Sequence, residues 1–549
     1  MNQDRLKFWK KPISLHTFIL GFSVWITLSL NFIFFEKLYQ LTPYKGFPAI
    51  LFIGAMVVLL TSYFNFIFNL LMWRWNVKIL AFIFLFIGGA TTYFNYLGIG
   101  IDAYQIQNLI ETDPHEARDL MSLNILLWVA VLLVLPLSIL SLFKIKKDKL
   151  LSTLKFKGGM ALGSFLMVSL LVFIYYADLA AILRENRNLK GFISPQSVFS
   201  STWSYYKKLA PKDNIPLQQY ARDAVLQLES SYSQPKLLVL VIGETARAEN
   251  FSLNGYARNT NPELSKLPIL NFTQVVSCGT STAVSVPCMF SGMPRKSYDP
   301  QVARHRENLL DILQHAGYHV IWMDNNSGCK EVCNRVEQYQ FPKVLQDKWC
   351  KGNECADDIL LDGLHDYLQN MTKNDKQPRV IVLHQMGSHG PAYYKRSPIQ
   401  FQHFQPFCNT NAIQGCSQQD LLNVYDNSIV YTDYILAKVI KQLQIQTKYQ
   451  TAMWYLSDHG ESLGEHGLYL HGAPYLFAPS QQTHVPMVLW FSKQWKVKHP
   501  EVIQCLNLRK NQKVSQDNLF PTVLSLMDVK TATKNPQLDL LANCKKTFG

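Results

Sequence analysis

The chain of 549 residues is long enough for two to four domains, at about 150 residues per domain, and for a large hydrophobic core. Its formal net charge of +14 is shared between two parts, because residues 1–182 carry 15 basic and 9 acidic side chains and the rest carries 38 and 30. No nucleic-acid-binding motif accompanies this charge, which argues against a nucleic-acid partner. A basic domain held at a membrane would instead be attracted to anionic lipid head groups.

Five apolar stretches in the first third of the chain are each close to the length that a membrane-spanning helix needs. The first of them is predicted to be an anchor and not a cleaved signal peptide, because no small-residue cleavage site stands out and four more stretches follow. The predicted spans cover residues 16–36, 48–72, 79–98, 123–143 and 158–181.

The loops between these stretches differ in their content of lysine and arginine. The N-terminal tail, the second loop and the fourth loop, KIKKDKLLSTLKFK, are basic, whereas the third loop contains the acidic segment IETDPHEARD. Basic loops stay on the cytoplasmic side of a membrane. We therefore expect a cytoplasmic N-terminus, and five crossings leave everything after about residue 182 outside.

A mixed polar and aromatic segment, residues 183–234, follows the last predicted span. Its Trp203, Tyr205 and Tyr206 suit a segment that lies along the membrane surface, where aromatic rings with polar tips are favoured. An ordinary linker with short helices is the alternative. We assign residues 1–182 to a membrane domain, 183–234 to a juxtamembrane bridge and 235–549 to an exported domain.

Short apolar or β-branched runs alternate with amphipathic stretches from about residue 235 onwards. The runs KLLVLVIGE, YHVIWMDNN, RVIVLHQMG, TAMWYLSDHG and VPMVLWFS are typical of buried strands. Such alternation predicts an α/β domain with a mostly parallel central sheet. In these sheets ligands bind at the carboxyl ends of the strands.

All ten cysteines lie in the part of the chain that is expected outside. Close pairs in an oxidising compartment favour disulfides, with zinc binding by C-x3-C and C-x4-C as the alternative. Pairing between sequence neighbours is the simplest arrangement, although the sequence does not prove it. It joins Cys278 to Cys288, Cys329 to Cys333, Cys350 to Cys355, Cys408 to Cys416, and Cys505 to Cys544.

Three residues with metal-binding side chains follow predicted strands: Glu244, Asp458 and His459. Two carboxylates and an imidazole suit Zn²⁺ and leave a fourth ligand position open. A hydroxyl group at that position would have a weakened O–H bond and would become a nucleophile. The sequence therefore predicts a metal-activated nucleophile.

The segment SCGTSTAVSVPC, residues 277–288, supplies candidate hydroxyl groups between two cysteines. The residue chemistry alone does not choose between Thr280, Ser281, Thr282 and Ser285. A helix start that is capped by hydroxyls and held by a disulfide is the alternative without catalysis.

Five motifs in order along the chain resemble the phosphoethanolamine transferases that modify lipid A, the family that includes the mobile colistin-resistance enzymes. They are GETARAENFSLNGY, CGTSTAVSVPCMFSG, DNNSGCKEVC, LHQMGSHGP and SDHGESLGEHGLYLHG. The resemblance covers nearly the whole chain. It implies five helices in the bacterial inner membrane followed by an alkaline-phosphatase-like catalytic domain in the periplasm.

The same resemblance assigns roles to individual residues. It implies that Thr282 is the nucleophile and that Glu244, Asp458 and His459 bind a zinc ion together with it. Substrate binding, or the binding of a second zinc ion, is implied for Lys330, His389 and His471, and further pocket positions for Asn326 and His384. His466 has no assigned role.

The implied reaction moves phosphoethanolamine from phosphatidylethanolamine to Thr282 and from there to a phosphate of lipid A, which would confer resistance to polymyxins. We expect the protein to act as a monomer. A glycerophosphate transferase is one alternative, and a receptor-like domain without turnover is another. A sulfatase is disfavoured because Ser285-Val-Pro-Cys-Met lacks the arginine of the sulfatase nucleophile motif.

Overall fold

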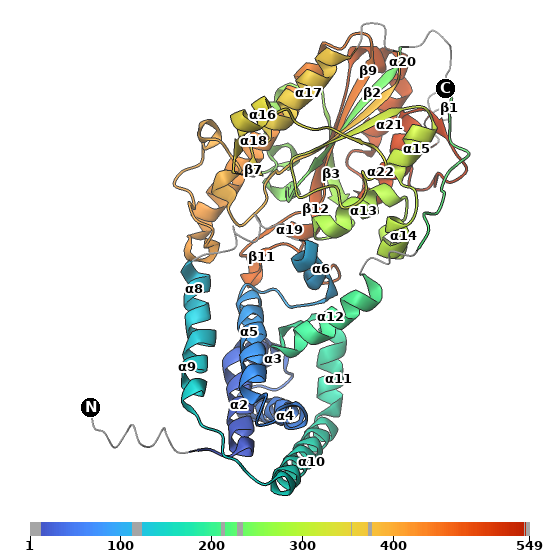
Figure 1. Cartoon of the computed structure of the whole chain (residues 1–549). Coiled ribbons are helices and arrows are strands. Elements are labelled where there is room, and N and C mark those ends of the chain that lie inside the picture. Colours follow the sequence, from blue (N-terminus) through green and yellow to red (C-terminus); the bar gives the residue numbers. More distant parts are fainter. Residues whose placement is uncertain are drawn as a thin grey trace. The chain divides into compact units, whose positions relative to one another are not determined.

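The computed structural model describes residues 12–111, 123–209, 215–227, 234–352, 354–371, 376–542 and 544. The chain divides into two compact units (Figure 1). The first unit contains residues up to 106 together with 121–207. The second contains residues 107–120 and 208–549.

The first unit consists of helices. Among the described residues, four helices are long and apolar enough to cross a membrane, and the number becomes five if the bent pair α2 and α3 forms one span. The two helices of this pair meet at an angle of 62°. The helices are α2 (Leu15–Leu30), α3 (Phe32–Leu41), α4 (Phe47–Leu71), α5 (Val77–Tyr96), the segment α8 (Leu123–Val129), η1 (Ala130–Val134) and α9 (Leu135–Leu142), and α10 (Leu150–Ile174).

The last spanning helix differs from its predicted range. α10 begins at Leu150 and ends at Ile174, whereas the sequence suggested 158–181. The charge of the lysines near its start predicts a loop there. Lys157 is instead helical and buried; its ammonium group donates to the backbone oxygen of Met72 and lies 4.3 Å from the centre of the Trp73 ring. A long lysine can therefore occupy the end of an apolar helix.

Shorter helices make up the remainder of the first unit and the beginning of the second. Within the proposed bridge, Trp203 and Tyr206 are exposed and Tyr205 is buried. Its position along a membrane surface remains a prediction. These helices are α6 (Ala103–Glu111), α11 (Tyr176–Glu185), η2 (Arg187–Phe192) and α12 (Gln196–Lys208).

An eight-stranded sheet forms the centre of the second unit, with the strand order β13-β3-β12-β9-β2-β8-β4-β5. β12 runs antiparallel to both neighbours, and the other neighbouring strands are parallel. The predicted mostly parallel sheet is confirmed. The strands are β2 (Lys236–Gly243), β3 (Leu270–Val276), β4 (His319–Asp324), β5 (Glu337–Gln338), β8 (Arg379–His384), β9 (Gln450–Ser457), β12 (His484–Phe491) and β13 (Val514–Ser515).

Helices cover both faces of this sheet (Figure 1). In β2, Leu238 and Leu240 pack with α13 (Thr282–Ser291), α15 (Leu309–His315) and α22 (Leu519–Leu526). The alternate residues Leu237 and Val239 pack with α17 (Asp358–Asn370) and α18 (Gln418–Gln444) on the other face. Side chains of a strand point alternately to opposite faces, so a continuous apolar run such as KLLVLVIG becomes buried on both.

The smaller elements lie around the sheet. Short helices among them are α14 (Pro300–Arg304), α16 (Lys343–Trp349), α19 (Ser480–Thr483), α20 (Lys493–Lys498), α21 (Pro500–Arg509) and η11 (Gln516–Asn518). Two-residue strands form three separate pairs: β1 (Val225–Leu226) with β14 (Val529–Lys530), β6 (Cys350–Lys351) with β7 (Glu354–Cys355), and β10 (Ser462–Leu463) with β11 (Tyr469–Leu470).

Five disulfides connect the ten cysteines, all within the second unit. Each joins the pair expected from sequence neighbours, and none of the cysteines is free. Zinc binding by cysteine thiolates is therefore excluded. The disulfides are Cys278–Cys288, Cys329–Cys333, Cys350–Cys355, Cys408–Cys416 and Cys505–Cys544.

Candidate active site

Glu244, Asp458 and His459 meet at the carboxyl edge of the sheet. β2 and β9 are parallel neighbours, and Gly243 pairs with Ser457, so the residue after each strand reaches the same place. His459 Nε2 lies 3.3 Å from Glu244 Oε1 and 3.4 Å from Asp458 Oδ2. All three side chains are fully buried, and their ligand atoms lie within 4.8 Å of one another.

Thr282 is the first residue of α13 and places its hydroxyl against this cluster. Its Oγ1 donates a hydrogen bond to Glu244 Oε2 at 3.0 Å and lies 3.4 Å from His459 Nε2. The hydroxyl of Thr280 instead donates to the backbone oxygen of Ala473. Ser285 Oγ is buried and has no hydrogen-bond partner in the described structure. Among the candidate hydroxyls, the contact with the carboxylate cluster belongs to Thr282.

The cluster fits a divalent cation. Glu244 Oε1 and Asp458 Oδ2 are buried, and neither accepts a hydrogen bond from a described residue. Buried carboxylate oxygens are almost always satisfied by donors or by a metal ion. Two carboxylates, an imidazole and a hydroxyl form a ligand set that suits zinc.

The pKa values of Glu244, Asp458 and His459 reflect the short distances between their charged groups. Burial disfavours the charged form of Glu244, but its contact with the His459 imidazole, 3.3 Å from Oε1, outweighs burial and holds the pKa of Glu244 well below its usual value. Burial and the negative charge of Glu244 raise the pKa of Asp458 to about 6. Burial lowers the pKa of His459, but the Asp458 and Glu244 carboxylates raise it overall to about 10. The carboxylates thus favour a positive charge between them.

Asn326 and His384 reach the cluster from the two neighbouring strands. Asn326 Nδ2 donates to Glu244 Oε2 at 2.7 Å and to the backbone oxygen of Gln385 at 2.8 Å. His384 ends β8, is fully buried, and places Nδ1 3.0 Å from Asp324 Oδ2. Asn326 therefore contacts a metal-ligand candidate directly, whereas His384 pairs with the partly exposed Asp324.

Two further histidines extend the site beyond the cluster. The His471 ring lies 4.5 Å from that of His459 and 5.5 Å from that of His389, measured between ring centroids. His471 Nδ1 lies 3.3 Å from Glu461 Oε1. Lys330 lies in the loop after β4, where its ammonium group donates to Ser327.

Glu461 was not among the residues selected from the sequence. It is fully buried, and its Oε1 has no hydrogen-bond partner in the described structure apart from its ion-pair contact with His471. The feature of the sequence that could have identified Glu461 is its position in SDHGESLG, two residues after His459. The role of a glutamate in a loop depends on which segment folds against it, and here that segment carries His471. The side chain of His466 lies outside the described part of the structure.

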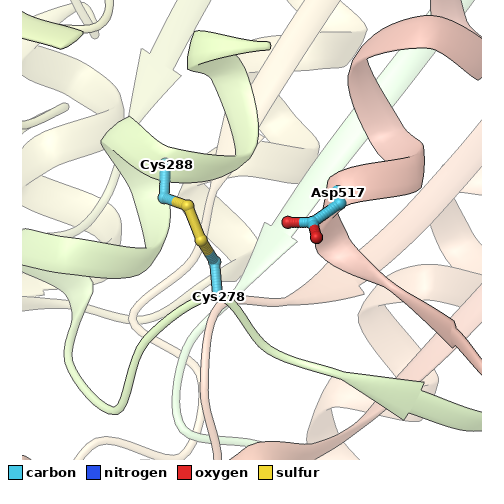
Figure 2. A group of neighbouring side chains, drawn as sticks. All are labelled: Cys278, Cys288 and Asp517. Carbon is cyan, nitrogen blue, oxygen red and sulfur yellow. A yellow bond between two sulfur atoms is a disulfide. The ribbon is translucent and has the colours of Figure 1, made fainter. Parts of the chain in front are cut away.

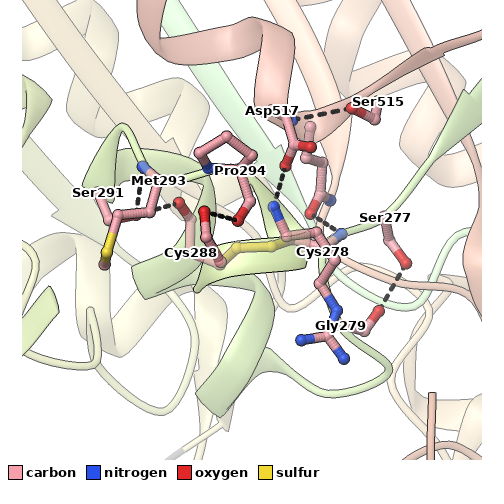
Figure 3. The surroundings of a disulfide bond; sticks show 12 residues. Ser277, Cys278, Gly279, Cys288, Ser291, Met293, Pro294, Ser515 and Asp517 are labelled. Carbon is pink, nitrogen blue, oxygen red and sulfur yellow. Dashed lines mark hydrogen bonds between the residues drawn. A yellow bond between two sulfur atoms is a disulfide. The ribbon is translucent and has the colours of Figure 1, made fainter. Parts of the chain in front are cut away.

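A second group of residues holds the segment that carries Thr282. Cys278, Cys288 and Asp517 lie close together, but the two sulfur atoms form a disulfide and cannot act as thiolate ligands (Figure 2). Asp517 Oδ1 accepts a hydrogen bond at 2.9 Å from the backbone N–H of Arg295, and the Asp517 N–H donates to Ser515 Oγ (Figure 3). This group is a structural clip around α13.

The fold and this site place the second unit in the alkaline-phosphatase-like superfamily. The sulfatase family model matches residues 236–529, and a model described as phosphoethanolamine transferase EptA/EptB matches residues 60–210.

Relatives cover almost the entire chain. Phosphoethanolamine transferase EptA of Escherichia coli K12 is 41% identical over 98% of both chains, and phosphatidylethanolamine transferase Mcr-1 of Escherichia coli is 35% identical over 97% of this chain and 98% of its own. The solved integral membrane lipooligosaccharide phosphoethanolamine transferase A of Neisseria meningitidis aligns with a TM-score of 0.91 at 37% identity, covering 97% of this chain and 99% of the other. The chain therefore belongs to the phosphoethanolamine transferase family.

Membership confirms the resemblance noted in the sequence. The predicted architecture, apolar helices followed by an alkaline-phosphatase-like domain, is that of the solved integral membrane relative. The predicted location, a multi-pass protein of the inner membrane with its catalytic unit in the periplasm, agrees with these relatives.

Proposed function

We propose that the chain transfers phosphoethanolamine from phosphatidylethanolamine to a phosphate group of lipid A, through a covalent intermediate on Thr282. The names of the relatives support both substrates: Mcr-1 is a phosphatidylethanolamine transferase, and the Neisseria enzyme acts on lipooligosaccharide. The observation that carries the proposal is the Thr282 hydroxyl, 3.0 Å from a buried carboxylate that also faces an imidazole.

Glu244, Asp458, His459 and Thr282 would hold one zinc ion, and His389 and His471 are the candidates for a second. A bound zinc ion would weaken the O–H bond of Thr282 and balance negative charge on the phosphoryl oxygens. Glu244 Oε1 and Asp458 Oδ2, which are buried and accept no hydrogen bond from a described residue, support this assignment.

In the first step, Thr282 Oγ1 attacks the phosphorus atom of phosphatidylethanolamine. The hydroxyl proton leaves along the hydrogen bond to Glu244 Oε2. The bond between phosphorus and the glycerol oxygen breaks, and diacylglycerol departs as that oxygen gains a proton from His471 or His389, which lie on the same side of the cluster. Thr282 then carries phosphoethanolamine.

Charge stabilisation accompanies this step. Because α13 begins at Thr282, the first N–H groups of the helix lie beside the reacting oxygen and favour an anionic phosphoryl group. Lys330, in the loop closed by the Cys329–Cys333 disulfide, supplies a positive charge for the non-bridging oxygens. In the second step a phosphate oxygen of lipid A attacks the same phosphorus atom, and the bond between phosphorus and Thr282 Oγ1 breaks as that oxygen regains its proton from Glu244 Oε2.

Both substrates are lipids, which gives the membrane helices a purpose. In this proposal residues 1–182 anchor the protein, 183–234 bridge to the catalytic domain, and 235–549 carry out the transfer. The added ethanolamine places an ammonium group on an anionic phosphate, which would weaken the attraction of polymyxins to lipid A.

The nucleophile is tested with Thr282→Ala in the full-length protein and vesicles containing labelled phosphatidylethanolamine. We expect diacylglycerol release to fall to background, because Thr282 is the hydroxyl that donates to a carboxylate of the cluster in the described structure, whereas Thr282→Ser keeps part of the activity. Ser285→Ala is the matched control, since it removes a buried hydroxyl from the same helix. Undiminished release by Thr282→Ala would remove Thr282 as the nucleophile.

The donor and acceptor are tested by mass spectrometry of lipid A from cells that express the protein. The expected product carries an added phosphoethanolamine group, and cells that make it should tolerate higher polymyxin concentrations than cells expressing Thr282→Ala. An added glycerophosphate group would instead indicate phosphatidylglycerol as the donor.

A further inference from the structure

The side chain of Gln516 connects the segment that leads to Thr282 with the end of β9, the strand that Asp458 follows. Gln516 is fully buried in η11. Its side-chain oxygen accepts a hydrogen bond at 2.6 Å from the backbone N–H of Cys278. Its amide nitrogen donates to the backbone oxygens of Ser457 and Asp458, each at 2.7 Å. The amide therefore uses its oxygen and both N–H groups for the backbone around the site.

The sheet itself does not make this connection. Cys278 follows β3 and Asp458 follows β9, and β12 lies between these two strands. Ladder hydrogen bonds join only neighbouring strands. Gln516 follows the edge strand β13, and its side chain reaches the ends of both β3 and β9. It thus links two segments that the backbone pairing leaves unconnected.

The loop that Gln516 holds leads directly into the nucleophile. Residues 277–282 form this nucleophile loop. Within it, Ser277 Oγ donates to the backbone oxygen of Gly279, and the sulfur of Cys278 is bonded to Cys288 in α13 (Figure 3). The disulfide fixes the loop to its own helix, whereas Gln516 is the contact that fixes it to Asp458.

We propose that Gln516 is a positioning residue, which sets the place of the Thr282 hydroxyl relative to Asp458 through Cys278. This inference deepens the proposed function and rests on Thr282 as the nucleophile. A displacement of about 1 Å in a reacting group reduces the rate by roughly 10²-fold. Loss of the Gln516 side chain should slow the chemical step, because that side chain contacts the backbone of Cys278 and Asp458 beside the proposed metal ligands.

The test compares Gln516→Met with Gln450→Met in the full-length protein, with phosphatidylethanolamine in vesicles as substrate. Gln450 is the matched control: it is equally buried, it lies at the opposite end of β9, and its Nε2 donates to the backbone oxygen of Gln234 at 2.8 Å. We expect Gln516→Met to lower kcat by about 100-fold with an unchanged KM, and Gln450→Met to keep the native kcat. The proposal would be overturned if Gln516→Met had the native kcat, or if only its KM rose.

Hydrogen–deuterium exchange provides a second readout that does not depend on turnover. In Gln516→Met the Cys278 N–H loses its acceptor, so the peptide covering the nucleophile loop should exchange faster than in the native protein and in Gln450→Met. Equal exchange in all three proteins would contradict the positioning role. This measurement still decides the question if Thr282→Ala keeps its activity and the proposed nucleophile is wrong.

A shorter variant covers the case in which the methionine does not fold. Gln516→Asn keeps the amide but is one methylene shorter, so it cannot span Cys278 and the carbonyl groups at the end of β9. We expect the same fall in kcat and the same faster exchange of the nucleophile loop. A Gln516→Asn protein with native kcat and native exchange would refute the inference.

Discussion

The two oxygens of the Glu244 carboxylate contact different residues of the site. Its Oε2 accepts hydrogen bonds from Thr282 and Asn326, and its Oε1 faces His459. The backbone behind it is equally constrained, because the backbone N–H of Ser388 donates to the Glu244 backbone oxygen, and a side chain at Gly387 would collide with that same oxygen at 2.7 Å. The carboxylate is therefore held in one orientation.

Replacing Glu244 by glutamine should abolish binding of the proposed zinc ion. Gln has the same shape but lacks the charge, and we expect zinc affinity to fall by more than about 100-fold, since even residues that only support a ligand contribute 10–100-fold. Metal analysis of the purified variant by mass spectrometry measures this loss.

Glu263→Gln is the matched control, because Glu263 is partly exposed and pairs with Lys266 at the surface. It should retain the native zinc content. Native zinc content in Glu244→Gln would show that the ion is held by other residues.

The helix α18 illustrates how a buried polar face supports the fold. Its Asp433 is fully buried and accepts hydrogen bonds from the backbone N–H groups of Glu263 and Leu264, which start the short helix η5 (Leu264–Lys266). Burial raises the pKa of Asp433 to about 7, although these hydrogen bonds act in the opposite direction. The folded protein therefore keeps a proton on Asp433 at pH values where the unfolded chain has lost it.

Protonation of Asp433 in the folded state makes the free energy of unfolding depend on pH. Between about pH 4 and pH 7 the folded state binds more protons at Asp433 than the unfolded state, so its contribution to the free energy of unfolding falls as pH rises, by up to roughly 4 kcal/mol. Asp433→Asn carries no titrating group and should flatten the pH dependence in this window. Denaturant unfolding at pH 4.5 and pH 7 measures the difference.

The control for this experiment is Asp347→Asn, which changes an exposed carboxylate paired with Lys343. Its pH dependence should match that of the native protein. An equally steep pH dependence in Asp433→Asn would mean that Asp433 is ionised in the folded state.

The disulfides divide the molecule into two chemically different parts, since all five lie in the second unit and none in the membrane helices. The loops they close differ in length. Cys505–Cys544 spans 39 residues, whereas Cys329–Cys333 spans 4. A longer loop loses more conformational entropy in the unfolded chain when it is closed.

Removal of the Cys505–Cys544 disulfide should therefore destabilise the second unit most. The loop-entropy relation gives about 4 kcal/mol for the double alanine variant at 505 and 544, and about 2 kcal/mol for the pair at 329 and 333. Denaturant unfolding of the two double variants, monitored by tryptophan fluorescence, measures both values. Equal losses would contradict an origin in loop closure.

Much of the site was visible in the sequence because its residues follow strands. Glu244 ends a run of apolar residues, and Asp458 and His459 end another, so parallel pairing alone brings them to one edge. The choice of Thr282 among four hydroxyls came from the family resemblance. In the structure the contact with Glu244 distinguishes Thr282, because the start of α13 turns this hydroxyl toward the cluster.

From the sequence alone we could predict the division into apolar helices and an α/β unit and the metal-ligand candidates, because periodicity and strand ends are local properties. Spacing favoured the neighbour pairing of the cysteines, and the structure established it. The place of β3, whose LNFTQVV mixes buried, half-buried and exposed positions without a regular alternation, and the partner of Glu461 became known from the folded structure. It alone revealed Gln516, since a bridge between residues 278, 458 and 516 depends on contacts between distant segments, which no local pattern encodes.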